Sequence, residues 1–385
     1  MSTRFERPRL ARTAEHSIVY RNDKEFCSWV FLGGLWDTAD KSLVVGFARN
    51  TVNYGDPHDI HHDKLSDRTK GKVVSLRSTD RGKTWDPNSM NLVFDLMTTP
   101  EDIAGNGPQN YAAEGPVDFL DKNVLVASGA VPAHFVPTAK PWISLSTDGG
   151  RSWRRPILMP MSGLHSLSGV ASAIVRPDGM SLVALTAVTP DGWTRRPLIY
   201  ASDNGVQWNF MTFMTPIEDD GQAVSDKIGS PRFGAHRYFY PRPILLKDGR
   251  MVASMRCQRD PTSILWTEMF ESEDGGRTWR FLSRVNDWGA PGDITELDDG
   301  RIVCVYGYRM PAYGMRYRVS EDGGRTWGSE IILRDDGGSW DLGYPRLIQH
   351  EKNKCLAIYY FNSKDDKIQN NGGVRHIAQS VFSPE

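Results

Sequence analysis

Short apolar runs, separated by turn-forming residues, follow one another along the chain and predict strands rather than helices. The segments 243–255 and 294–306 each contain two apolar runs with an Asp-Gly pair between them. Asp-Gly between β-rich runs is a strong hairpin signal, because a tight turn needs residues that tolerate positive φ. We therefore predict antiparallel hairpins that turn at Asp248-Gly249 and at Asp299-Gly300.

A second turn pattern, Ser-x-Asp-x-Gly-x-x-Trp, recurs in one register. Complete copies begin at Ser78, Ser146, Ser272 and Ser320, and a degenerate copy begins at Ala201. The Asp side chain can accept hydrogen bonds from the turn backbone, and the Gly supplies the positive φ that the turn requires. We predict that these aspartates are structural and take no part in catalysis.

These two turn patterns alternate and divide the chain into similar units. Strand, Asp-Gly turn, strand, longer loop, strand, second turn and strand together form a four-stranded blade. The blades are predicted at residues 27–98, 114–160, 166–216, 238–286, 290–335 and 342–383. The last unit lacks a fourth strand, which residues 16–20 would supply and so close the ring. We predict an all-β, six-bladed β-propeller over residues 1–385; a seventh blade within the polar stretch 216–240 is the alternative.

Composition narrows the classes of partner. The net charge is −1 and 24% of the residues are charged, which favours neither nucleic acid nor an acidic membrane surface as a ligand. No run of 18 apolar residues predicts a membrane span, and the first residues lack the apolar region of a secretory signal. The four isolated cysteines have no metal-site spacing and are expected to be reduced core thiols in a cytoplasmic protein without a metal or other cofactor: Cys27, Cys257, Cys304 and Cys355. The oligomeric state stays open.

Chemistry-bearing residues are concentrated where a propeller places its functional loops, at the starts of first strands and the ends of second strands. The starts of first strands carry Glu114, Tyr240, Arg242, Asp293, Tyr344 and Arg346. The ends of second strands carry Arg49, His134, Arg256 and Arg309. The long loop of the first unit adds His58, Asp59, His61, His62, Asp63 and Asp67. Each arginine on this face costs desolvation unless it is paired, so a purely structural propeller would have little need of several.

The repeated Ser-x-Asp-x-Gly-x-x-Trp turns resemble the Asp boxes, or BNR repeats, of the sialidase superfamily, and the resemblance covers nearly the whole chain. It implies a β-propeller that acts on a carbohydrate, with a tyrosine nucleophile and arginines that bind the substrate carboxylate. Residues 248–256 resemble the blade that ends in an active-site arginine, which points to Arg256, with Arg309 a looser match. Gly343-Tyr344-Pro345 resembles the nucleophile segment, which points to Tyr344. The spacing before the first Asp box points to Asp67 as general acid, or to Asp59 or Asp63.

Two positions depart from the family pattern. The segment that supplies the first arginine is absent, since Cys27 follows Phe26, and Tyr240 stands where the family has a glutamate base. Arg49, Arg242 or Arg346 would have to rebuild the anion site.

Three functions follow from these residues. The first is an exo-glycosidase that hydrolyses a terminal acidic sugar, in which a carboxylic acid protonates the leaving oxygen and either Tyr344 or a carboxylate-activated water attacks. The second is a uronate-specific lyase, in which His58, His61, His62 or His134 removes a proton and a tyrosine returns one. The third is a glycan-binding propeller without catalysis. The simpler interpretations are a packed aromatic for Tyr344, ion pairs for Arg256 and Arg309, a solvated loop for the histidines, and a buried, partnered Glu114.

Overall fold

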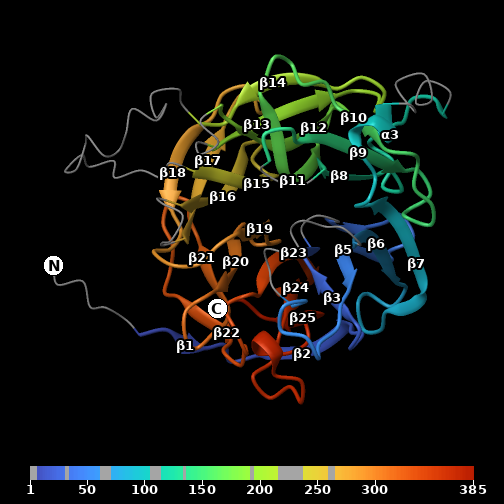
Figure 1. Cartoon of the computed structure of the whole chain (residues 1–385). Coiled ribbons are helices and arrows are strands. Elements are labelled where there is room, and N and C mark those ends of the chain that lie inside the picture. The colour runs from blue at the N-terminus through green and yellow to red at the C-terminus, as the bar shows by residue number, and fades with distance from the viewer. Residues whose placement is uncertain are drawn as a thin grey trace.

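The computed structural model describes residues 7–30, 34–60, 71–104, 114–132, 136–190, 195–215, 237–258 and 265–385. The chain forms a β-propeller of six blades around a central axis (Figure 1), and the predicted fold is confirmed. None of the described helices is long and apolar enough to cross a membrane.

The blades consist of antiparallel strands that follow one another in sequence. The first blade contains β3 (Glu25–Ser28), β4 (Gly34–Asp37), β5 (Leu43–Thr51), β6 (Gly71–Ser78) and β7 (Asp86–Asp95). The second and third contain β8 (Leu125–Val131), β9 (Lys140–Ser146) and β10 (Ile157–Leu158), then β11 (Ser166–Val175), β12 (Ser181–Val188), β13 (Arg195–Ser202) and β14 (Asn209–Phe213). The fourth and fifth contain β15 (Arg237–Leu245), β16 (Met251–Gln258), β17 (Leu265–Ser272) and β18 (Arg280–Arg284), then β19 (Gly292–Glu296), β20 (Ile302–Tyr308), β21 (Gly314–Ser320) and β22 (Ile331–Arg334). The sixth contains β23 (Gly343–Glu351), β24 (Lys354–Phe361) and β25 (His376–Phe382). Two short helices, α3 (Pro100–Ala104) and η3 (Asn370–Gly372), lie in loops.

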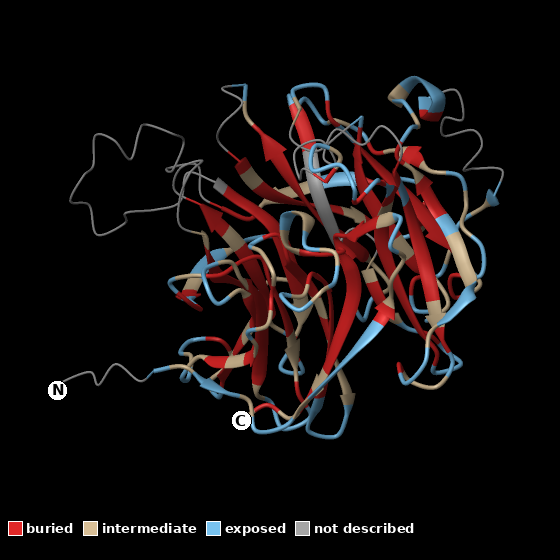
Figure 2. Ribbon diagram, turned by 60° about the horizontal axis from the view of Figure 1, so that its bottom comes forward, coloured by how far each residue is buried: buried red, intermediate tan, exposed pale blue. Residues whose placement is uncertain are grey.

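The predicted Asp-Gly hairpins join the first and second strands of their blades. β15 and β16 pair from Leu245–Met251 outward, and Gly249 between them has φ +89°. β16 is a central strand whose described residues are almost all buried, because it is covered on both faces by the neighbouring blades. Figure 2 shows this arrangement throughout, with buried residues along the strands and exposed residues at the turns.

The first strands of neighbouring blades contact one another next to the centre of the ring. β11 contacts β15, β15 contacts β19, and β19 contacts β23, as Figure 1 also shows. Side chains that are far apart in the sequence therefore meet near the axis. Blades three and four are joined further by one parallel bridge between residues 195 and 237.

The N-terminal segment contributes to two blades. β1 (Arg9–Leu10) pairs in parallel with β22 at the edge of the fifth blade. β2 (Ala14–Tyr20) then pairs antiparallel with β25 and forms the outermost strand of the sixth blade. Strands from opposite ends of the sequence thus share one sheet, which leaves no open edge between the first and last blades.

In the four complete copies the aspartate organises its turn as the sequence predicts. In the degenerate copy the prediction for Asp203 is wrong, because Asn204 Oδ1 accepts the turn N–H groups instead, from Val206 at 2.8 Å and Gln207 at 3.2 Å. In the copy at 320–327, Asp322 Oδ1 accepts the backbone N–H groups of Arg325 at 3.0 Å and Thr326 at 2.8 Å, while Ser320 Oγ accepts the N–H of Gly324 at 2.8 Å. Burial opposes the shift, but hydrogen bonds from the Thr326 hydroxyl and N–H, the Ser320 hydroxyl and the Arg325 N–H lower the pKa of Asp322 to about 2. The carboxylate is fully committed to its own turn, which leaves it no catalytic role.

Several Asp boxes also hold neighbouring blades together. Trp85 Nε1 donates to Gln379 Oε1 of β25 at 2.9 Å, Trp153 Nε1 to Ser75 Oγ of β6 at 3.0 Å, and Trp327 Nε1 to Ser283 Oγ of β18 at 3.0 Å. The indole of each of these boxes therefore reaches into the preceding blade of the ring. This contact between blades was not predicted from the motif.

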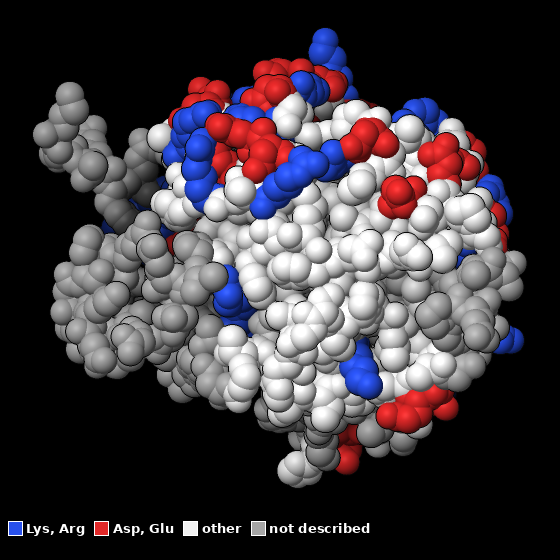
Figure 3. Space-filling view, turned by 90° about the horizontal axis from the view of Figure 1, so that it is seen from above, with Lys and Arg blue, Asp and Glu red and all other residues white. Residues whose placement is uncertain are grey.

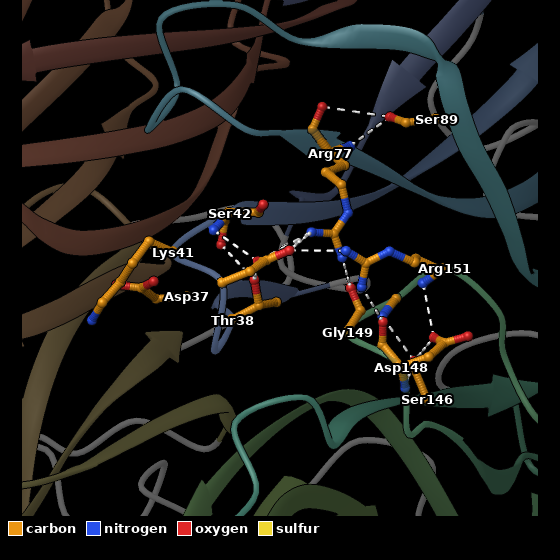
Figure 4. Close-up of polar contacts among 12 residues, drawn as sticks. Asp37, Thr38, Lys41, Ser42, Arg77, Ser89, Ser146, Asp148, Gly149 and Arg151 are labelled. Atoms are coloured by element: carbon orange, nitrogen blue, oxygen red, sulfur yellow. Dashed lines mark hydrogen bonds and ion pairs between the residues drawn. The ribbon is translucent and has the colours of Figure 1, made fainter.

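Charged side chains make similar connections on the face that carries the boxes. Arg151 Nη2 lies 2.9 Å from Asp40 Oδ2 of the first blade, and Arg77 donates to the carbonyl of Gly149 in the second box (Figure 4). In Figure 3 the positive and negative side chains gather in a band along the upper edge of the view, where they are interleaved. This band is not a patch of a single sign.

One expectation for an individual strand is wrong. Glu114 does not begin a strand, and its residue is exposed; the first strand among residues 114–132 is β8. The first strand of the first blade is divided into β3 and β4, which both pair with β5. The four cysteines are buried and form no disulfide.

Candidate functional site

Tyr344 lies at the start of β23, next to the propeller axis. The pairing of β23 with β24 is shifted between Gly343 and Arg346, and the backbone of Tyr344 has φ +50°. A bulky residue rarely adopts this left-handed conformation, so the surrounding structure must hold it there. Gly343 permits the arrangement, because a Cβ at this position would lie 2.9 Å from the Cα of Gly307 in the fifth blade.

Two arginines from other blades flank the ring of Tyr344. Arg256, at the end of β16, donates from Nη1 to Tyr344 Oη at 2.7 Å. The guanidinium carbon of Arg309, just after β20, lies 4.8 Å from the centre of the Tyr344 ring. The sequence therefore brings together residues 256, 309 and 344 from three consecutive blades. Two guanidinium groups on one side of a site can together bind a carboxylate.

A buried polar network supports the segment that carries Tyr344. Tyr360 Oη donates to Asp341 Oδ1 at 2.6 Å, and Arg375 Nε lies 3.5 Å from Asp341 Oδ2. The Tyr360 ring in turn lies 5.8 Å from the Tyr344 ring. Burial and the Asp341 carboxylate raise the pKa of Tyr360, so this phenol remains a hydrogen-bond donor.

Arg309 is tied to the same segment. Its Nη2 donates to the carbonyl of Leu342 at 3.1 Å. Burial alone would lower the pKa of Arg309, but Tyr344, Tyr360 and Asp341 raise it above the usual value for arginine. The site therefore keeps a permanent positive charge beside Tyr344.

Tyr240 occupies in the fourth blade the position that Tyr344 occupies in the sixth. Each tyrosine begins a Tyr-Pro-Arg sequence at a shifted register, and the backbone of Tyr240 has φ +58°. The two rings lie 5.7 Å apart. The guanidinium carbon of Arg256 lies 4.5 Å from the ring of Phe239 and 5.5 Å from that of Tyr240. Aromatic rings thus surround the charged end of Arg256, which restricts its direction.

The arginines of the two Tyr-Pro-Arg sequences lie in a buried group of charges. Arg346 Nε is 3.5 Å from Asp293 Oδ2, which also accepts the backbone N–H of Leu347 at 2.8 Å. Arg242 is 1% exposed, and burial followed by the charge of Arg346 lowers its pKa to about 9, against the opposing effect of Asp293. These charges join the first strands of blades four, five and six. Their burial suits a structural role near the axis better than direct contact with a ligand.

The other predicted residues that the structure describes have partners of their own. Arg49 Nη1 is 3.2 Å from Glu25 Oε1 in its own blade, and Arg154 Nε is 3.2 Å from Glu114 Oε2. Asp59 Oδ2 accepts the N–H of Asn53 at 2.6 Å and so closes a local turn, next to the exposed His58. His61, His62, Asp63, Asp67 and His134 lie outside the described residues, so their predicted roles stay predictions.

Several residues of the site were missed by the sequence analysis. Phe239, Asp341, Tyr360 and Arg375 line or support it, and Trp340 lies at its edge with the Arg309 guanidinium carbon 5.6 Å from its ring. The repeated Tyr-Pro-Arg sequence was the one available signal, because it marks two blades with the same bulge. Among the described residues, no three His, Cys, Asp or Glu side chains are grouped as metal ligands.

Comparison with known proteins identifies the family. A model for the BNR repeat-like domain matches residues 120–356. The chain belongs to this family. It is a sialidase-like BNR propeller. Two curated relatives are sialidases. The sialidase from Bacteroides fragilis (strain YCH46) is 21% identical over 80% of this chain and 57% of its own length, and that from Clostridium perfringens is 23% identical over 63% of this chain and 59% of its own length. The chain thus spans less than two thirds of the length of these relatives.

Solved structures show the same fold at low sequence identity. A protein of unknown function from Dyadobacter fermentans has a TM-score of 0.71 and 22% identity, with 96% of this BNR propeller and 98% of that chain covered. Trypanosoma rangeli sialidase has a TM-score of 0.59 and 12% identity, with 97% and 60% covered. An α-L-arabinanase from Penicillium chrysogenum has a TM-score of 0.56 and 12% identity, with 96% and 98% covered. These likenesses concern the fold alone.

Proposed function

We propose that this BNR propeller is a glycosidase that hydrolyses the terminal bond of a sugar bearing a carboxylate. The observation that carries the proposal is the contact of 2.7 Å between Arg256 Nη1 and Tyr344 Oη, beside the second guanidinium of Arg309. Two adjacent arginines suit a carboxylate on the substrate, and the tyrosine between them suits nucleophilic attack. The sialidase names of two relatives agree with an acidic sugar.

In this mechanism the arginines act first. Arg256 and Arg309 bind the substrate carboxylate and place the anomeric carbon at Tyr344 Oη. Tyr344 attacks that carbon as its phenolate while a carboxylic acid protonates the leaving oxygen, and the glycosidic bond breaks. Water then attacks the same carbon and gives a proton to the carboxylate formed in the first step, and the phenolate of Tyr344 leaves as the sugar is released. The acid is assigned from sequence alone to Asp67, with Asp59 and Asp63 as alternatives.

A uronate lyase is the second candidate, and the pair of adjacent tyrosines favours it. Tyr240 and Tyr344 have ring centres 5.7 Å apart, and Arg256 lies against both. As a phenolate, Tyr344 would remove the C5 proton of the uronate, and Tyr240 would protonate the leaving oxygen as the C4–O bond breaks. The product would carry a C4–C5 double bond, which hydrolysis does not form.

One assay separates these functions. The protein is incubated with oligosaccharides that end in sialic or uronic acid, and both new reducing ends and near-ultraviolet absorbance are followed. We expect new reducing ends without an increase in absorbance. Tyr344→Phe should lower the activity by a factor of about 100 or more, because the variant lacks the nucleophile.

Tyr200→Phe is the matched control. Tyr200 is a buried tyrosine of the third blade whose hydroxyl donates to the carbonyl of Pro160 at 2.6 Å, far from the site in sequence and blade. It should retain activity. A product that absorbs in the near-ultraviolet would show that the protein is a lyase and not a hydrolase. A Tyr344→Phe variant as active as wild type would refute both mechanisms.

A further inference from the structure

Trp340 is an exposed aromatic residue at the edge of the Arg309–Tyr344 site. Its residue is 47% exposed, although Asp341 and Leu342 beside it are buried. The Arg309 guanidinium carbon lies over the indole, 5.6 Å from its centre, and the same group lies 4.8 Å from the Tyr344 ring. The Arg309 guanidinium therefore packs near both the exposed indole and the tyrosine that we propose as nucleophile.

The loop that carries Trp340 is fixed on both sides of the indole. Before it, the Gly337 N–H donates to the carbonyl of Tyr313 at 2.9 Å, and the Gly338 N–H to that of Asn362 at 3.0 Å. Arg375 Nη2 donates to Ser339 Oγ at 3.1 Å. After it, Asp341 accepts the hydrogen bond of Tyr360.

The packing of this loop is equally close. A Cβ at Gly338 would lie 2.1 Å from the carbonyl oxygen of Gly372, so only glycine fits there. A large apolar side chain that is half exposed on a loop held this firmly is presented to solvent in one position. Such rigid, exposed aromatic rings suit ligand binding, since little side-chain entropy is lost when the ligand arrives.

From this geometry we infer that Trp340 is a platform for the sugar ring on the leaving-group side of the scissile bond. The inference rests on the proposed function, because it takes the carboxylate-bearing sugar to lie at Arg256 and Arg309. The leaving oxygen lies on the side of the anomeric carbon opposite Tyr344. Tyr344 is only 4% exposed, so the next sugar of the chain extends outward to the rim of the site, where the indole beside Arg309 is exposed. The ligand class is a neutral pyranose, which stacks its apolar C–H face on the indole while its hydroxyl groups stay in water.

The test compares a monosaccharide with a trisaccharide that ends in the same acidic sugar. Binding of both is measured by calorimetry in Tyr344→Phe, which prevents turnover, and in the same variant with Trp340→Ala or Trp340→Phe added. We expect the trisaccharide to bind about tenfold more tightly than the monosaccharide, the ratio that corresponds to about 1.4 kcal/mol. Trp340→Ala should abolish this gain and leave monosaccharide binding unchanged, while Trp340→Phe should keep most of it.

Phe281→Ala is the matched control, since Phe281 is a 53% exposed aromatic residue of β18. It should preserve the gain. If the monosaccharide binds and the gain survives Trp340→Ala, the platform is refuted while the proposed acidic-sugar site stands. If neither sugar binds, both proposals fail.

Discussion

Replacement of Arg256 by methionine removes one charge from the site and keeps a side chain of similar length. Arg256 Nη1 donates to Tyr344 Oη at 2.7 Å, and the rings of Phe239, Tyr240 and Tyr344 lie within 4.5 to 5.9 Å of its guanidinium carbon. The methionine side chain can pack against the same aromatic rings. The change therefore tests the charge and its hydrogen bond more than the packing.

The expected effect follows from the interactions that are lost. A hydrogen bond to a charged group contributes about 1.5–3 kcal/mol. A unit charge about 4 Å from a phenolate or carboxylate contributes up to ~4 kcal/mol at an effective dielectric constant of about 20. Part of this attraction also exists in the ground state, so we expect the barrier to rise by about 2–4 kcal/mol. This corresponds to a decrease of about 30- to 1000-fold in kcat/KM.

Steady-state kinetics with an acidic-sugar substrate measures the effect. Arg284→Met is the control: Arg284 also lies over an aromatic ring, 4.8 Å from Trp266, but it belongs to β18. If Arg256→Met changes kcat/KM no more than Arg284→Met does, Arg256 has no role in the reaction.

Three further predictions concern the supporting structure. Tyr360→Phe should lower kcat about tenfold with KM nearly unchanged, because Asp341 loses its hydrogen bond from Tyr360 and the Tyr344 segment is held less firmly. If circular dichroism shows a loss of secondary structure that matches the loss of activity, the cause is a folding defect instead. Asp322→Ala should lower the free energy of unfolding by about 1–3 kcal/mol in a urea titration at neutral pH. The folded-state pKa of Asp322 is depressed to about 2, so its stabilisation is lost on protonation and the difference from wild type should shrink as the pH falls from about 4 towards 2. A difference that stays constant over this pH range would contradict the prediction. Burial lowers the pKa of His376, so the unfolded state binds more protons than the folded state, and the melting temperature should fall as the pH drops below about 6.5. His376→Gln should weaken this pH dependence. If the variant keeps the same pH dependence, His376 is not its source.

The repeated turns could be predicted from sequence because each is a local structure. The Asp box at 320–327 needs only its own Ser, Asp and Gly, and the hairpin at 248–249 only its Asp-Gly pair. Repetition of such units then specifies blades, since each blade must bury its faces against the next. The second blade is less regular, and Glu114 lies in its irregular part.

The site was less accessible to sequence reasoning, because side-chain direction depends on bulges and on alternation along strands. The bulges at Tyr240 and Tyr344 place both rings near the axis and bury Arg242 behind them. Arg49 shares its side of β5 with Phe47, which packs on Tyr20 of β2, so it meets Glu25 and Tyr20 rather than the other arginines. Neither the burial of Arg242 nor the direction of the Arg49 side chain can be predicted from the residue types alone.

A crystal structure of Tyr344→Phe with an acidic monosaccharide, either sialic acid or glucuronic acid, tests the site most directly. We expect the sugar carboxylate within hydrogen-bonding distance of both Arg256 and Arg309, with the anomeric carbon facing residue 344. A sugar bound elsewhere on the propeller, or bound here with its carboxylate turned away from both arginines, would contradict the assignment of this site.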